Sequence, residues 1–256
     1  MKKYLVIGNP IDHSLSPKLH NYWIKRNNLN AIFEKKLIEE KDLKGLCNDV
    51  RKGRIEGFNV TVPFKEKIIK YLDSCTETAN AVKAVNTVYR KLKDGEHIVE
   101  GDNTDVSGFQ RSCPLANNSK RGASALIIGA GGASKAVILG LSNLNVKRFA
   151  IINRTREKAE NLMSQIIKPE SYRAHFVYEW CKDEENMTKP DIVVNCTSLG
   201  LKEKDRIPLD FSKYKKRFFT KKIIFYDLIY NPEETNFLYN AKKIGQKAIN
   251  GKMMFL

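Results

Sequence analysis

The chain has 256 residues, of which 42% are hydrophobic and 29% are charged, with 15 Gly and 8 Pro. This composition excludes disordered, collagen-like and disulfide-scaffold proteins and predicts one large globular domain or two modest ones. The 45 Lys and Arg residues against 29 Asp and Glu residues give a net charge of +16, but they are scattered and match no nucleic-acid-binding motif, so we expect no nucleic-acid partner.

No segment has the pattern of a secretory signal or a membrane span. The first apolar run, residues 4–7, ends at Gly8, which is too short for a signal peptide. No later stretch approaches the ~18 apolar residues of a membrane helix. The five cysteines are widely spaced and form no Cys-x-x-Cys pair, which argues against a metal site or a disulfide framework. We therefore expect a cytoplasmic protein without a membrane partner or a metal ion.

The first half of the chain alternates short strands with helices. We expect strands at residues 4–7, 31–33 and 57–62. Helices are expected to begin at Ser16-Pro17, with Ser16 as the N-cap, near Asp42 and at Phe64. A β-hairpin is expected over residues 87–99, because Asp94-Gly95 supplies a two-residue turn.

The second half is more regular, with apolar strands expected at residues 125–128, 149–152, 191–194 and 223–226. Short apolar strands separated by helices predict a parallel sheet that is covered on both faces. The polar stretch at residues 111–121 indicates a helix end and a connection. The expected fold class is α/β, with two α/β domains.

A glycine-rich turn follows the strand expected at residues 125–128 and opens a helix. Gly129 permits a tight turn, Gly131 lets the backbone approach a pyrophosphate, and the small Ser134 stands where a third glycine is usual. Within this strand, turn and helix context, the pattern favours a dinucleotide site over a purely structural turn.

The next strand ends in Asn153-Arg154-Thr155-Arg156, with Lys158 beyond it. An NAD enzyme usually carries Asp or Glu at this position to hold the ribose 2′-hydroxyl. Cations there suit a 2′-phosphate, which favours NADP. The alternative is that Arg156 and Lys158 form the solvated first turn of a helix, although cations at that end oppose the helix dipole.

Small polar side chains gather beside turns in the first half. Asn59 and Thr61 lie two residues apart in an expected strand and so share a face, and Lys65 follows four residues later. Taken alone, Lys65 would be read as a solvated lysine. Together with the neighbouring hydroxyl, amide and carboxylate groups, it fits binding of a polyhydroxylated acid and a proton transfer.

Eight motifs occur in the order and spacing of the shikimate dehydrogenases, which the chain resembles from Tyr4 to Leu256. They are residues 9–17, 59–65, 84–87, 101–105, 129–134, 153–155, 195–200 and 226–230. The resemblance implies the reversible, NADPH-dependent reduction of 3-dehydroshikimate to shikimate, on the route to chorismate and aromatic amino acids. Two alternatives stay open: a broader quinate/shikimate dehydrogenase, and a catalytically silent ligand-binding relative.

The resemblance also implies roles for individual residues. Lys65 and Asp105 would be the catalytic pair that manages the proton at the substrate oxygen, and Tyr230 would reach the substrate from the cofactor domain. The other substrate contacts would be Ser14 and Ser16 at the carboxylate, with Asn59, Thr61, Asn86 and Asp105 at the ring hydroxyls. The cofactor contacts would be Gly129, Ala130, Gly131, Gly132, Ala133, Ser134, Asn153, Arg154, Thr155, Lys158, Thr197, Ser198, Leu199, Leu228 and Gly251.

The same resemblance implies a domain plan. Residues 1–104 would form the substrate-binding and catalytic domain, and residues 105–235 a Rossmann-type NADP-binding domain, with a cleft between them. Residues 236–256 would be a closing segment, shortened because family members continue into a helix whose Gln touches substrate. Met253 stands where a glycine is common in the family. We expect a monomer or a homodimer.

Overall fold

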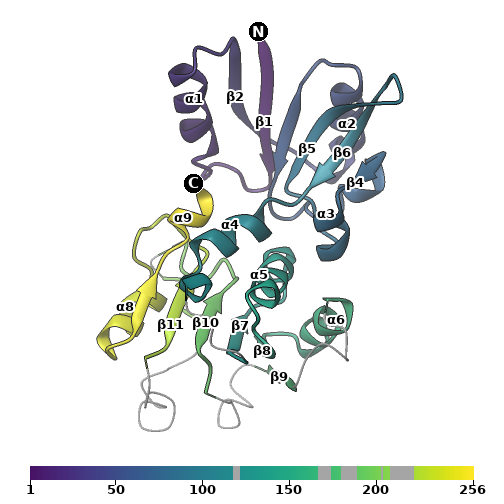
Figure 1. Cartoon of the computed structure of the whole chain (residues 1–256). Helices are drawn as coiled ribbons and strands as arrows, with labels where there is room; N and C mark the ends of the chain where they lie inside the picture. The colour runs from purple at the N-terminus through teal and green to yellow at the C-terminus, as the bar shows by residue number, and fades with distance from the viewer. Residues whose placement is uncertain (118–121, 167–173, 180–188, 203, 208–221) are drawn as a thin grey trace. The chain divides into compact units, whose positions relative to one another are not determined.

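The computed structural model describes residues 1–117, 122–166, 174–179, 189–202, 204–207 and 222–256 (Figure 1). The chain divides into an N-terminal unit, Met1–Thr104, and a C-terminal unit, Asp105–Leu256. Among the described residues, no helix is long and apolar enough to cross a membrane.

The N-terminal unit is built on a mixed sheet of six strands in the order β2-β1-β3-β5-β6-β4. β1 pairs in parallel with β2 and β3, whereas β5 and β6 form the expected antiparallel hairpin around Asp94-Gly95. The predicted strands of this half are confirmed, except that the strand expected over residues 57–62 ends at Val60, before Thr61; the two-residue β4 was not expected. The bounds are β1 (Lys2–Gly8), β2 (Ala31–Leu37), β3 (Gly57–Val60), β4 (Ser74–Cys75), β5 (Thr87–Lys93) and β6 (Glu96–Asp102).

Two apolar clusters hold this sheet, one on each face. Leu5 and Ile7 of β1 pack with buried residues of α2 (Leu43–Arg51), whereas Val6, which alternates with them, packs with residues of β2 and α1 (Ser16–Arg26). Successive side chains of a strand point to opposite faces, so α1 and α2 cover the two sides. A short helix, α3 (Glu77–Val82), follows β4.

Two expectations in this unit are wrong in detail. Ser16 is the first residue of α1 and does not cap it, because Leu15 occupies the N-cap and the Ser14 hydroxyl accepts the Ser16 N–H at 3.3 Å. The helix expected from Phe64 is instead a series of turns ending in a 3-10 helix, Ile69–Tyr71. The Lys65 carbonyl accepts the Val85 N–H at 2.7 Å, so it is engaged outside any local helix.

The C-terminal unit contains the predicted parallel sheet. All of its pairs are parallel, and the strand order is β12-β11-β10-β7-β8-β9. This is the Rossmann order, in which the first and fourth strands, β7 and β10, are neighbours at the centre. The bounds are β7 (Ser124–Ile128), β8 (Arg148–Asn153), β9 (Ala174–Glu179), β10 (Ile192–Asn195), β11 (Ile224–Asp227) and β12 (Lys247–Ile249).

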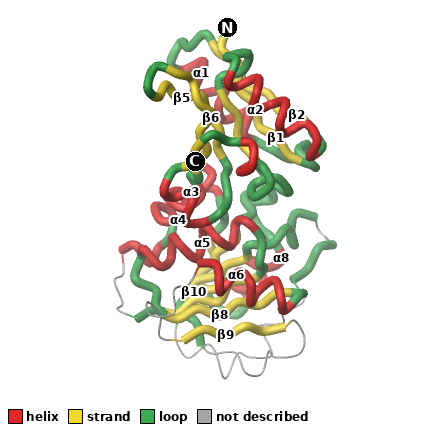
Figure 2. Tube along the Cα trace, turned by 90° about the vertical axis from the view of Figure 1, so that its right-hand side faces the viewer, coloured by secondary structure: helices red, strands yellow, loops and turns green. Residues whose placement is uncertain are grey.

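Helices cover both faces of this sheet (Figure 2). In β7, Ala125 and Ile127 join a core with α4, α5 and α6, whereas Leu126 and Ile128 join a second core with α8. Figure 2 shows α5 and α6 running across the strands. Residues 118–121 of the expected connection lie outside the described residues. The bounds are α4 (Asp105–Ser112), α5 (Gly132–Asn143), α6 (Arg156–Ile166), α8 (Asn236–Lys243) and α9 (Lys252–Phe255).

This topology fixes where a ligand can bind in the C-terminal unit. In an open α/β sheet, ligands bind outside the carboxyl ends of the strands where the strand order reverses. Here that point lies between β7 and β10, and it brings together the turn after β7 and the loop after β10.

Candidate active site

The turn after β7 is locked against its two neighbours. Gly129 has a φ of +101°, and a Cβ at this position would lie 2.7 Å from the Thr197 side chain, so only glycine fits without strain. The Gly129 N–H donates to the Ile152 carbonyl at 2.8 Å. The predicted tight turn therefore lies at the carboxyl ends of β7, β8 and β10.

The outer side of the same turn is open. Gly131 is exposed and forms the N-cap of α5, and a Cβ there would meet nothing within 4 Å. The N–H groups of Gly132 and Ala133 begin the helix, where no preceding helix carbonyl can accept them. Free N–H groups and the positive end of the dipole make this helix start suitable for a pyrophosphate. The residues present therefore fit a dinucleotide.

Ser134 faces inward. Its side chain is fully buried, its hydroxyl donates to the Gly129 carbonyl at 2.9 Å, and its N–H donates to the Gly131 carbonyl at 3.0 Å. Both donors are thus used inside the turn. Ser134 shapes the loop and ties the helix to the strand end.

Substitution of Gly129 and of Gly131 should affect stability and NADP binding differently. Gly129→Ala should lower the free energy of unfolding by at least about 1–2 kcal/mol, because alanine disfavours a left-handed φ and its methyl meets Thr197. Gly131→Ala should change stability by less than about 1 kcal/mol, since its methyl enters open space. It should nevertheless weaken NADP binding at least ~10-fold, because the methyl occupies the space that the pyrophosphate needs. Denaturant unfolding and NADP titration measure the two effects, and equal stability losses would contradict this assignment.

Three basic residues with exposed side chains follow β8. Asn153 shapes the turn by donating to the Thr155 carbonyl at 2.8 Å. Arg156 pairs with Glu160 one helical turn later at 2.8 Å, which is the solvated-helix arrangement weighed above. Arg154 and Lys158 are exposed and, within the described part of the chain, form no ion pair or hydrogen bond. These two cations are available to a phosphate.

The loop after β10 is shaped by one asparagine. The Asn195 side-chain oxygen accepts from the Thr197 N–H at 3.0 Å and from the Thr197 hydroxyl at 2.7 Å. The Asn195 amide group donates to the Leu199 carbonyl at 3.2 Å. Residues 197–199 are thereby folded back onto the strand end, while Ser198 stays exposed.

A buried carboxylate stands beside this asparagine. Asp227 is fully buried and ends β11 in direct register with Asn195. It accepts from the Asn195 amide at 2.9 Å, the Ile229 N–H at 3.0 Å and the Thr235 hydroxyl at 2.6 Å. Desolvation raises the pKa of Asp227 to about 6, although these three donors favour the charged form. Sequence reasoning missed this role, even though each residue comes directly after an expected strand.

Asp227 should leave a signature in the pH dependence of stability. Between its ordinary pKa of 3.8 and about 6, the folded protein binds a proton that the unfolded chain does not. The free energy of unfolding should therefore fall as pH rises through this window, by up to about 3 kcal/mol from this group. Urea unfolding of the wild type and Asp227→Asn at several pH values tests this. A constant difference between the two proteins across the window would refute it.

The segment after β11 carries the remaining predicted contacts of this unit. Gly251 donates its N–H to the Ile229 carbonyl at 3.1 Å, and a Cβ at Gly251 would collide with the Leu228 carbonyl. The Tyr230 ring stacks on Phe255 of α9, with ring centroids 4.3 Å apart and planes 19° apart. Leu228, Tyr230 and Gly251 are therefore held close together.

In the N-terminal unit, two predicted substrate residues meet. The Asn59 amide donates to the Asn86 carbonyl at 3.3 Å and to the Thr87 hydroxyl at 3.1 Å. The side-chain oxygen of Asn86, which is buried, accepts from the Thr104 N–H and the Thr87 hydroxyl, both at 3.0 Å. Asn59 and Asn86 therefore have fixed orientations on one side of the sheet.

Thr61 and Lys65 lie just beyond β3. Although β3 ends at Val60, the Thr61 N–H still donates to the Ile7 carbonyl at 2.9 Å. The Lys65 backbone is tied to Val85, the residue before Asn86. Both side chains are half-buried. Their backbones are thus anchored to the strands that carry Asn59 and Asn86.

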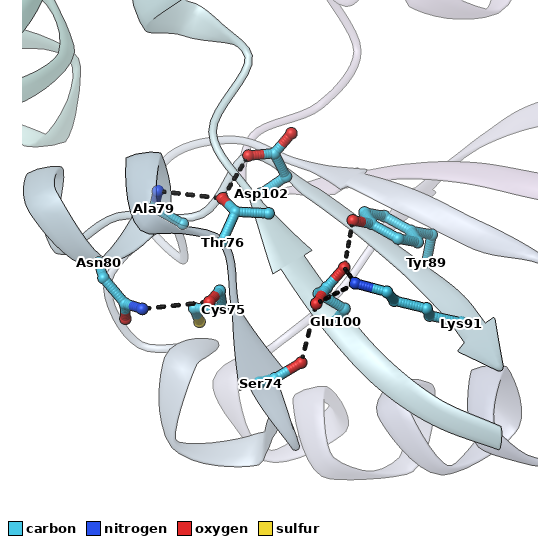
Figure 3. Close-up of polar contacts among 9 residues, drawn as sticks. All are labelled: Ser74, Cys75, Thr76, Ala79, Asn80, Tyr89, Lys91, Glu100 and Asp102. Atoms are coloured by element: carbon cyan, nitrogen blue, oxygen red, sulfur yellow. Dashed lines mark hydrogen bonds and ion pairs between the residues drawn. The ribbon is translucent and has the colours of Figure 1, made fainter. Parts of the chain in front are cut away.

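Hydrogen bonds of Asp102 and of the buried Asn103 anchor the segment leading to Asp105, and Figure 3 shows the bond between Asp102 and Thr76. The Asp102 carboxylate accepts the Thr76 hydroxyl at 2.5 Å and the Asn103 N–H at 2.7 Å, and the Asn103 amide donates to the Ala84 carbonyl at 2.9 Å. Asp102 therefore has the turn-stabilising role expected of an Asp-Asn-Thr sequence. Asp105 itself is the half-buried first residue of α4, in the C-terminal unit.

A second buried carboxylate secures the neighbouring edge strand. Glu100 accepts from the Tyr89 hydroxyl at 2.5 Å, from Lys91 at 2.9 Å and from the Ser74 hydroxyl at 3.1 Å (Figure 3). Ser74 and Cys75 form β4, and Thr76 follows directly. Glu100 thus fixes the position of β4, which has only two residues in the sheet.

Ser14 lies just before α1, and Ser16 is the first residue of that helix. The Ser14 N–H donates to the Ile11 carbonyl at 3.1 Å, and the Ser14 hydroxyl accepts the Ser16 N–H. Both side chains are half-buried. The turn therefore places two hydroxyls close together at one end of the N-terminal sheet.

Comparisons with known proteins identify the family of the chain. The family described as the shikimate dehydrogenase substrate binding domain matches residues 6–88, and the family described as shikimate / quinate 5-dehydrogenase matches residues 115–204. An NADP(+) shikimate dehydrogenase from Pelagibacter ubique is 42% identical over 255 residues, covering 100% of this chain and 89% of its own length.

Solved structures give the same result. The shikimate dehydrogenase of Aquifex aeolicus is 36% identical with a TM-score of 0.82, covering 100% of this chain and 88% of its own. The Thermus thermophilus shikimate 5-dehydrogenase, solved with NADP(H) and shikimate, is 30% identical with a TM-score of 0.80, covering 100% and 89%. With these identities extending over its whole length, the chain belongs to the shikimate dehydrogenase family.

Proposed function

We propose that this chain is an NADP-dependent oxidoreductase that interconverts 3-dehydroshikimate and shikimate. The observation that carries the proposal is the turn after β7, which is open to a pyrophosphate at the point where the strand order reverses. Because the chain belongs to the shikimate dehydrogenase family, we assign the reaction of that family to this cofactor site.

We assign the cofactor contacts to residues of the C-terminal unit. The N–H groups of Gly131, Gly132 and Ala133 would hold the pyrophosphate, and Arg154 with Lys158 would bind the 2′-phosphate. Thr197, Ser198, Leu199, Leu228 and Gly251 would lie beside the nicotinamide. When bound, NADPH supplies the hydride for the ring ketone.

We assign most of the substrate contacts to residues of the N-terminal unit. The Ser14 and Ser16 hydroxyls would donate to the substrate carboxylate. Asn59 and Asn86, oriented by their shared hydrogen bonds, would bind ring hydroxyls together with Thr61. Tyr230 would add its hydroxyl from the C-terminal unit.

Lys65 and Asp105 would perform the proton transfer. In the direction of reduction, the Lys65 ammonium stabilises the negative charge that develops on the ketone oxygen and donates a proton to it. The Asp105 carboxylate would favour the charged lysine and accept a hydrogen bond from a neighbouring ring hydroxyl. In the direction of oxidation, neutral Lys65 would take the proton from the hydroxyl that is oxidised.

The test is the initial rate of shikimate-dependent reduction of NADP, with NAD and quinate as the comparison cofactor and substrate. Turnover of shikimate with NADP supports the proposal. Comparable turnover of quinate would favour the broader quinate/shikimate activity. NADP binding without turnover of either acid would support the silent ligand-binding relative.

We also propose a cytoplasmic location and a monomeric or homodimeric state. The four cysteines in the described part of the chain are unpaired, as in a reducing compartment, and the fifth, Cys181, lies outside the described residues. Light scattering on the purified protein would distinguish the monomer from the homodimer, and a larger assembly would contradict both.

A further inference from the structure

A buried hydrogen-bonded group joins the two loops that surround the proposed nicotinamide site. Asn195 ends β10 and Asp227 ends β11, and the two residues are opposite one another in the parallel pair. Both are fully buried. β10 and β11 lie side by side in Figure 1. Because both residues are the last of their parallel strands, the group lies at the carboxyl edge of the sheet.

Each end of this group holds a different loop. On the β10 side, Asn195 accepts the N–H and hydroxyl of Thr197 and donates to the Leu199 carbonyl. On the β11 side, Asp227 accepts the Ile229 N–H, one residue before Tyr230, and the Thr235 hydroxyl. The Asn195 to Asp227 hydrogen bond of 2.9 Å links the two sides.

Thr235 extends the group into α8. Its side chain accepts the Leu238 N–H at 3.3 Å and so caps the helix, while its hydroxyl donates to Asp227. The segment between Asp227 and Thr235, which carries Tyr230, is therefore fixed at both ends by one carboxylate.

A buried carboxylate contributes little net stability to a core. Burial opposes its charged form, and apolar side chains of similar volume commonly stabilise a core at least as well. What the carboxylate adds is direction, since each of its oxygens accepts donors only from defined positions. Its partners here are the two loops at the proposed reaction centre.

We propose that Asp227, together with Asn195 and Thr235, is a positioning group. It holds the loop of residues 197–199 and Tyr230 in the geometry needed for hydride transfer. The inference rests on the proposed function and assigns these residues no contact with substrate or cofactor. Misplacement of reacting groups by about 1 Å can cost ~100-fold in rate, so small loop shifts have measurable effects.

The variants separate positioning from stability. Asp227→Asn keeps the shape but turns one acceptor into a donor facing Thr235. Thr235→Val removes the hydroxyl, whereas Thr235→Ser keeps both the hydrogen bond and the cap. The matched control is Phe237→Leu, which removes packing from the buried face of α8 and leaves the hydrogen bonds in place.

The experiment measures kcat for shikimate oxidation, the NADP dissociation constant and the kinetic isotope effect with shikimate deuterated at the oxidised carbon. We expect Asp227→Asn and Thr235→Val to lose about 10- to 100-fold in kcat and to show a larger isotope effect. NADP affinity should change less than about threefold, because the glycine turn is untouched. Thr235→Ser and Phe237→Leu should retain the wild-type kcat and isotope effect.

Two outcomes would overturn different claims. Full kcat in Asp227→Asn and Thr235→Val, or an equal loss in Phe237→Leu, would overturn the positioning role while the wild type still turned over shikimate. Absence of shikimate turnover in the wild-type protein would overturn the proposed function itself, and the positioning role with it.

Discussion

Replacing Lys65 with alanine should lower kcat for shikimate oxidation by about 10²- to 10⁴-fold, the range for loss of a positioned acid or base. Without the Lys65 amine, no base stands beside the substrate hydroxyl to take its proton as the hydride leaves. The Lys65 side chain is only half-buried, and its backbone bond to Val85 does not involve the side chain, so the fold should persist. Steady-state kinetics together with thermal unfolding separate these two effects.

The neighbouring Lys67 gives a matched control. It lies in the same turn region and pairs with Glu40 at 2.5 Å, and a surface ion pair of this kind adds little to stability. Lys67→Ala should therefore keep the wild-type kcat. Near-wild-type turnover of Lys65→Ala would remove the proposed acid–base role. A comparable loss in Lys67→Ala would show that general charge near the site, not Lys65, is responsible.

Replacing Arg154 with alanine should raise KM for NADP by about 10- to 100-fold and leave KM for NAD within about twofold. A hydrogen bond between charged partners contributes about 1.5–3 kcal/mol, and only NADP has the 2′-phosphate. Arg154 is exposed, so its removal should not affect folding. Initial rates with each cofactor give the ratio directly.

Arg148, at the opposite end of the same strand, is the control for general charge loss. It is exposed and donates to the Gly122 carbonyl at 3.1 Å. Arg148→Ala should leave the NADP to NAD ratio unchanged. Equal effects of Arg154→Ala on the two cofactors would reject the 2′-phosphate assignment.

The parallel sheet of the C-terminal unit could be predicted because its signals are local. The four expected strands, β7, β8, β10 and β11, are short apolar runs, and the glycine turn stands directly between a strand and a helix. The hairpin at Asp94-Gly95 was equally predictable, since both turn residues have positive φ. Short elements such as β4 and β12 were missed, because two or three residues carry no periodicity.

What could not be predicted depends on partners that are distant in the sequence. The Lys65 carbonyl bonds to Val85, and this bond replaces the helix that the local pattern favoured. Asp227 reaches Asn195 across the β10–β11 pair, so neither residue alone reveals the group. The inward side chain of Ser134 likewise becomes evident only once the turn is folded.

The pairing order of the C-terminal sheet has a consequence for how this unit assembles. β7 pairs with β8, which follows it closely, and also with β10, which comes only after β9. The two walls of the proposed cofactor cradle, Gly129 and Thr197, therefore meet only after a long loop has closed, and such distant pairings form slowly. A ligand that needs both walls stabilises only chains that have completed this step. During refolding, the recovery of NADP binding should therefore report the fraction of molecules in which β10 has paired with β7.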